Sequence, residues 1–319
     1  MKWNKLGMVF DLKKNQLPVG IGQFAQSPQT LVFDDFVRIY FSTREYDAAA
    51  SKFLSVIAYV DFDKAFKTIL NISSHKVIEL GGLGSFDEHG IFPINILRHK
   101  EKILAYTCGW SRRVSVSVDT STGLAYSTNN GETFEKVGTG PVLTSSLREP
   151  FLVGDSFVTV YNDVFHMWYI YGERWLTPTS VEPPARVYKI AYARSDDGIN
   201  WNKNEGQQII SDVLGTDECQ ALPTVLKIGN RYHMYFCFRY ATDFRNNPER
   251  GYRLGYAWSD DLVHWTRDDN NAGIEKSAEG WDSEMMCYPH IFQCDDQVYL
   301  LYNGNEFGKY GFGLAKLEQ

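Results

Sequence analysis

One short turn is written three times in this chain. "YARSDDGINW" runs from Tyr192 to Trp201, "YAWSDDLVHW" from Tyr256 to Trp265, and a looser copy, "AYSTNNGETF", covers residues 125–134. Each copy follows an alternating, strand-like segment and is followed by an aromatic and a basic residue ("TFEK", "NWNK", "HWTR"). Asp, Asn and Gly are the residues that tight hairpins need, because they tolerate positive φ and bind local N–H groups. The repeat therefore predicts strand, turn, strand units, and we interpret the turn as structural rather than catalytic.

A second repeated segment precedes these turns. It consists of a proline, a short apolar run, a polar turn, and a strand rich in Tyr, Phe and Met. Its five copies begin at Ser27, Phe92, Glu149, Leu222 and Tyr288. Three copies are followed by the clear turn, and "SVIAYVDFDKAF" after the first copy is a degenerate version of it. An aromatic content of 15% together with 26 glycines also favours strands and turns.

Five four-stranded units without helical periodicity predict an all-β fold, a five-bladed β-propeller that forms one domain over residues 1–319. The last unit lacks a strand at its C-terminal end. The N-terminal segment "KWNKLGMVF" can supply it, because Trp3-Asn4-Lys5 repeats Trp201-Asn202-Lys203. We therefore expect an N-terminal strand to close the last blade and cover its edge. A β-sandwich with coincidental turns is the alternative.

Composition excludes several classes of function. A formal net charge of −7 argues against a nucleic-acid partner, since duplex binding depends on Lys and Arg. The N-terminus has no apolar signal region, and no apolar stretch reaches membrane-spanning length. The five cysteines are spread out with no CxxC pair, as in reduced thiols of a cytoplasmic protein. No metal or cofactor is predicted.

Four units carry a carboxylate at about the same place, just before the proline segment. In a propeller the inner strands converge on the axis, so we expect these carboxylates to gather at one central funnel. Clustered carboxylates repel each other, which raises one pKa and leaves another group ionised, as acid and base catalysis require. The alternative is that each caps its own turn in solvent. The four candidates are Asp87, Glu149, Glu218 and Asp282.

Further funnel residues are predicted where the hairpins begin and end. Aromatic faces, planar amides and guanidinium groups suit a sugar, and several arginines in one pocket suit a carboxylate or phosphate on it. We therefore expect a carbohydrate substrate, acidic or phosphorylated. The alternative is that the arginines pair with the neighbouring carboxylates. The candidates for substrate binding are Gln26, Arg44, His89, Trp110, Arg148, Trp175, Arg239 and Asn303.

The pattern resembles the five-bladed propeller superfamily of glycoside hydrolases that includes invertases, levansucrases, arabinanases and β-xylosidases. "DECQALP" at 217–223 is similar to the invertase motif whose glutamate is the general acid, which implies that role for Glu218. "REP" at 148–150 resembles the family's Arg-Asp-Pro motif, which implies that Glu149 stabilises the transition state. The chain also looks like propellers of bacterial polysaccharide gene clusters.

One departure from that superfamily leaves the reaction open. Its first blade usually has an aspartate before a proline, whereas this chain has Gln26-Ser27-Pro28. The resemblance then implies that Asp87 or Asp282 activates water or attacks the sugar. Sugar transfer or phosphorolysis is the alternative, because phosphate or an activated donor makes a protein nucleophile unnecessary. A non-catalytic propeller that binds a glycan or a protein is the third possibility.

Overall fold

The computed structural model describes residues 1–177 and 183–318. Nearly all regular structure in this part of the chain is β-strand. The helical pieces are short: α1 (Asn305–Gly308) and the 3₁₀ turns η1 (Pro248–Arg250) and η2 (Asp269–Asn271). None of the described helices has the length and apolar character needed to cross a membrane.

The strands form antiparallel units, which we number one to five in chain order. Unit one consists of β2 (Gln26–Val32), β3 (Phe36–Asp47), β4 (Lys52–Asp63) and β5 (Ile69–Ile72). Unit two consists of β6 (Gly90–His99), β7 (Lys102–Arg112), β8 (Val118–Ser127) and β9 (Glu135–Lys136). Unit three consists of β10 (Val153–Tyr161), β11 (Val164–Leu176), β12 (Ala185–Ser195) and β13 (Asn202–Lys203). Unit four consists of β14 (Glu218–Ile228), β15 (Arg231–Tyr240), β16 (Arg253–Ser259) and β17 (Thr266–Arg267). Unit five consists of β18 (Cys287–Cys294), β19 (Gln297–Asn303), β20 (Gly311–Leu317) and β1 (Trp3–Asp11). One parallel pair, Ser55 with Gly90, joins units one and two into a single sheet.

The two ends of the chain share unit five. Strand β1 pairs antiparallel with β20, with Trp3 opposite Leu317. The buried Trp3 indole donates a 2.8 Å hydrogen bond to the hydroxyl of Tyr235 in unit four. This is the pairing that the repeated Trp-Asn-Lys sequence predicted, and it covers the outer edge of β20.

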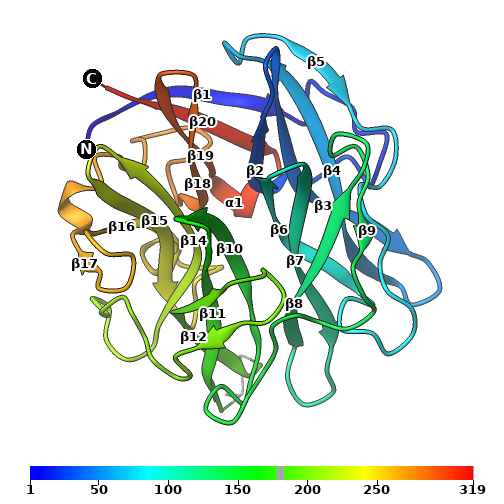
Figure 1. Cartoon of the computed structure of the whole chain (residues 1–319), viewed down its shortest axis with the longest axis vertical. Helices are drawn as coiled ribbons and strands as arrows, with labels where there is room; N and C mark the ends of the chain where they lie inside the picture. Colours follow the sequence, from blue (N-terminus) through cyan, green and yellow to red (C-terminus); the bar gives the residue numbers. More distant parts are fainter. Residues whose placement is uncertain (178–182, 319) are drawn as a thin grey trace.

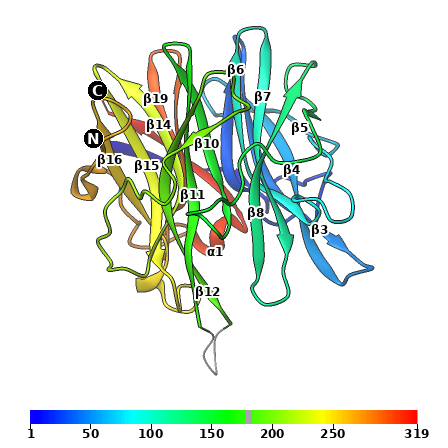
Figure 2. The ribbon, with the colours of Figure 1, turned by 60° about the horizontal axis from the view of Figure 1, so that its bottom comes forward.

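The units follow one another around a common centre, with β2, β6, β10, β14 and β18 nearest to it (Figure 1). Each of these inner strands packs against the next, and β18 packs against β2. Apolar side chains fill the space between neighbouring units, as Phe10, Phe41 and Phe312 do between units five and one. Figure 2 shows the β3–β4 and β7–β8 hairpins projecting on the same side of the molecule.

The repeated turns are stabilised in one common way. The Ser195 hydroxyl accepts a hydrogen bond from the N–H of Gly198 at 2.9 Å, and Asp197 accepts two more from the backbone that follows. Ser127 and Ser259 make the equivalent bond in their own turns. These residues satisfy backbone donors locally, so the turns are structural.

Candidate functional site

A pocket of about 450 Å³ lies between the units, and all five contribute to its walls. This volume is typical of sites for small ligands. Its walls are mainly aromatic and cationic. The aromatic and arginine side chains that line it are Phe24, Phe92, Trp110, Tyr188, Phe244, Tyr252, Tyr288, Phe307, Arg44, Arg186, Arg239 and Arg245.

In units three, four and five, a break in the pairing of the inner strand brings one side chain to this pocket. In unit three the break lies between Gly154 and Phe157, and Asp155 has a φ of 50°. Leu222 and Tyr288 occupy the matching breaks of units four and five, with φ values of 50° and 55°. Because a bulge redirects the side chain it carries, all three line the pocket.

Asp155 is the one carboxylate that lines this pocket among the described residues. Burial raises its pKa from 3.8 to about 7, although Arg186, the Leu222 backbone and Cys108 act in the opposite direction. A carboxyl group with this pKa is divided between its protonated and ionised forms near neutral pH. It can therefore donate or accept a proton during a reaction.

Four predicted binding residues meet in this pocket: Gln26, Arg44, Trp110 and Arg239. The Arg44 guanidinium donates a 2.8 Å hydrogen bond to Gln26 Oε1 and another to the Ser55 hydroxyl. Burial lowers the pKa of Arg44. Gln26 therefore orients an arginine at the position where the resemblance would have placed a catalytic aspartate.

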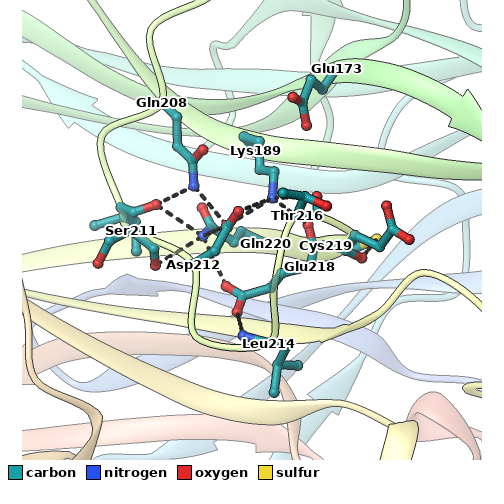
Figure 3. Close-up of polar contacts among 12 residues, drawn as sticks. Glu173, Lys189, Gln208, Ser211, Asp212, Leu214, Thr216, Glu218, Cys219 and Gln220 are labelled. Carbon is teal, nitrogen blue, oxygen red and sulfur yellow. Dashed lines mark hydrogen bonds and ion pairs between the residues drawn. The ribbon is translucent and has the colours of Figure 1, made fainter.

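Glu218, predicted as the general acid, does not reach the pocket. Its side chain is fully buried, and its Oε1 accepts a 2.6 Å hydrogen bond from Arg267. Its Oε2 accepts two more from the N–H groups of Val213 and Leu214, the second of which can be followed in Figure 3. A group enclosed in this way has no path to a substrate, so its placement does not fit the role expected of it.

The other three predicted carboxylates are also buried away from the pocket. Each is buried and paired with a lysine on the outermost strand of its own unit. The alternative of a solvated turn cap is therefore wrong, and the four residues do not gather at one funnel. The pairs are Asp87–Lys136 at 2.5 Å, Glu149–Lys203 at 2.7 Å and Asp282–Lys5 at 2.7 Å.

The remaining predicted binding residues are dispersed. Trp175 lines a second pocket of about 380 Å³ that adjoins the first. His89 lies beside Trp110, with the ring centroids 5.9 Å apart, but lines neither pocket. Arg148 is exposed and also lines neither pocket. Asn303 is fully buried, and its side-chain hydrogen bonds within the described residues are to backbone groups, including the N–H of Ser27.

Sequence reasoning missed Asp155, Arg186 and Arg245. Asp155 was missed because unit three differs from the others: its proline, Pro150, lies before β10 instead of inside the inner strand. In the other units the residue directly before the proline lies in the bulge. This position in the sequence therefore indicates where the inner strand is interrupted. Arg245 lies between β15 and β16, outside any repeated segment.

Residues 1–177 and 183–318 contain no group of three or more His, Cys, Asp or Glu side chains that could hold a metal ion.

No family model matches the chain. Over the full length of both proteins it is 33% identical to "Uncharacterized protein MT1551" of Mycobacterium tuberculosis (strain CDC 1551 / Oshkosh), and equally to "Uncharacterized protein Rv1502" of strain H37Rv. This protein belongs to the family of these two proteins. A shorter segment of 105 residues is 29% identical to the β-1,2-mannobiose phosphorylase of Thermoanaerobacter sp. (strain X514), covering 32% of this chain and 33% of that protein.

Solved structures show the fold of this family. One glycoside hydrolase matches with a TM-score of 0.70 at 16% identity, over 93% of this chain and 88% of that one. A thermostable family-43 glycoside hydrolase matches with a TM-score of 0.66 at 13% identity, over 95% and 92%. The family thus has the fold of the β-propeller glycoside hydrolases.

Proposed function

We propose that this protein is an enzyme that acts on a glycosidic bond in the 450 Å³ pocket. Its frame is one five-bladed propeller over residues 1–319, closed by β1. The five strand units, the β1–β20 pairing and the packing of β18 against β2 support this frame. The likeness to propeller glycoside hydrolases supports a carbohydrate substrate. A cytoplasmic location stays a prediction.

The observation that carries the proposal is the placement of the Asp155 carboxyl group in a pocket walled by aromatic rings, where burial raises its pKa to about 7. The protonated form of Asp155 gives its proton to the departing glycosidic oxygen. Proton transfer by a well-placed side chain contributes roughly 10²–10⁴-fold to a rate. The aromatic walls offer faces on which the CH groups of a sugar can pack.

Phosphorolysis is the second candidate, because Asp155 has no partner carboxylate along the pocket wall among the described residues. Hydrolysis with protein acid and base uses two carboxyl groups about 5–9.5 Å apart. In phosphorolysis a phosphate oxygen attacks the anomeric carbon, the bond to the departing oxygen breaks, and Asp155 protonates that oxygen. The arginines can hold the phosphate, and the local likeness to a mannobiose phosphorylase points the same way.

The test is turnover of an oligosaccharide panel with and without inorganic phosphate. Hydrolysis releases a free reducing sugar in both conditions, whereas phosphorolysis releases a sugar 1-phosphate only when phosphate is present. Asp155→Asn should reduce turnover at least about 100-fold with ligand binding retained. Asp196→Asn, an exposed carboxylate in a turn, is the matched control and should leave turnover unchanged. Binding of a glycan that is never converted would instead identify a non-catalytic propeller.

A further inference from the structure

The second pocket is an outward continuation of the first. The two share four lining residues: Arg186, Arg239, Phe244 and Arg245. Trp175 and Asn246 belong to the outer pocket alone. A ligand longer than one sugar unit can therefore occupy both pockets and pass the three arginines at their boundary.

Among the described residues, the three boundary arginines contact aromatic rings and neutral oxygens. In the described part of the chain none of them forms an ion pair. The guanidinium carbons of Arg239 and Arg245 lie 3.5 and 4.4 Å from the centroid of the same Phe244 ring. Arg239 donates to the Tyr188 hydroxyl and to two backbone carbonyls, while its buried Nε has no partner.

Among the described residues that line this boundary, arginines outnumber carboxylates. Arg186, Arg239 and Arg245 line both pockets, whereas only Asp155 on the inner side and Asp243 on the outer side carry carboxylates among the described lining residues. Partial burial and the neighbouring charge of Arg239 lower the pKa of Arg245. Two guanidinium groups against one ring repel each other, so an anion placed between them is stabilised.

The outer pocket is larger than a bare anion requires. Its volume of about 380 Å³ lies within the range of small-molecule sites, and Trp175 and Phe244 provide aromatic faces beside the arginines. This combination of ring faces and cations matches a sugar ring that carries its own negative charge.

We propose that the boundary arginines bind an acidic group carried by the sugar in the outer pocket, a carboxylate or a phosphate ester, so that the protein selects anionic glycans. This inference rests on the proposed function, since it names the class of substrate for the same site. The acidic group belongs to the substrate and is distinct from free phosphate that acts as a nucleophile.

The experiment measures binding to the full chain by calorimetry, with matched probes. Galacturonate is compared with galactose, glucose 6-phosphate with glucose, and inorganic phosphate is run alone. We expect at least one acidic sugar to bind about tenfold or more tightly than its neutral parent, as one or two charge-assisted hydrogen bonds allow. Arg245→Met should remove that preference. Arg194→Met, an exposed arginine on β12 outside both pockets, should keep it.

Three outcomes overturn the inference. The first is equal affinity for acidic and neutral sugars, or no binding of any sugar at tens of millimolar. The second is an acidic preference that Arg245→Met leaves intact. The third is binding of inorganic phosphate without binding of either acidic sugar, which would favour phosphorolysis while refuting the anionic substrate. Failure of the proposed function is recognised separately, because Asp155→Asn would then leave turnover unchanged.

Discussion

Glu218 at the start of β14 is bound by Arg267 of β17 at 2.6 Å, so that a buried ion pair joins the first and last strands of unit four. Units two, three and five contain the equivalent ion pair, with lysine in place of arginine and with the carboxylate in the segment just before the first strand. Unit one lacks both partners of this ion pair, because its first strand begins with the neutral Gln26 and its last strand, β5, has no basic residue. We infer that acid and base form one structural element, which holds the short outer strand on its unit.

Removing one partner of this pair should destabilise the protein strongly. Arg267→Met leaves the Glu218 charge buried and unpaired, and we expect a loss of about 3–5 kcal/mol in the free energy of unfolding. The double variant Glu218→Gln, Arg267→Met removes both charges and should regain a large part of that loss. Urea denaturation at pH 7 measures both. A single-variant loss below about 1 kcal/mol would contradict the structural role.

Asp155 and Glu218 should respond differently to substitution, and Asp155 should make the stability of the protein depend on pH. The folded pKa of Asp155 is about 7, above its ordinary 3.8. Between these values the folded chain holds a proton that the unfolded chain has released. Stability therefore falls as pH rises from about 4 to about 7, by up to about 1.4 kcal/mol per unit, and is level above that range.

Asp155→Asn should abolish this dependence, which is measured by comparing both proteins in urea at pH 5 and pH 8. The variant gains stability relative to the natural chain at the higher pH. Turnover of the natural chain should decline above pH 7, as the proton donor ionises. Glu218→Gln should instead lower stability and leave turnover per folded molecule nearly intact. If Glu218→Gln abolished turnover without loss of stability, the assignment of the site to Asp155 would be wrong.

Neighbouring units are also joined through their repeated turns. The Tyr106 hydroxyl of unit two donates a 2.9 Å hydrogen bond to the carbonyl of Gly198 in unit three, and Tyr40 of unit one does the same to Gly131 in unit two at 2.7 Å. Tyr106→Phe leaves a buried carbonyl without a donor, so we expect a loss of about 1–3 kcal/mol in the free energy of unfolding. Tyr46→Phe, at an exposed position, is the control. Equal stability of the two variants would contradict the prediction.

The repeat was sufficient to predict the units, because each turn has its Ser and its Asp or Asn written locally, and two of the three copies have Gly at the position of positive φ. It predicted four residues of the pocket wall, Gln26, Arg44, Trp110 and Arg239, but not Asp155, for two physical reasons. Equivalent carboxylates such as Glu149 occur at equivalent places, but the side chain points along its own sheet to Lys203 and away from the centre. The residue that does face the centre, Asp155, is set by a backbone bulge that no local composition announces. The basic partner in such an ion pair was nevertheless visible in the sequence, because a lysine or arginine follows each repeated turn.

The N-terminal strand offers the most direct test of how the chain ends cooperate. Deleting residues 1–11 removes β1, exposes the edge of β20, leaves Asp282 without Lys5, and takes the Trp3 indole from Tyr235. We expect the truncated chain to associate through the free edge and to lose cooperative unfolding, since an open strand edge pairs with other chains. Size-exclusion chromatography and thermal unfolding by circular dichroism measure both effects. Lys5→Met alone separates the two causes, because it should lower stability by about 3–5 kcal/mol while the chain keeps the association state of the unmodified protein. A truncated chain that stays in that state and melts cooperatively would show that β1 is dispensable to the fold.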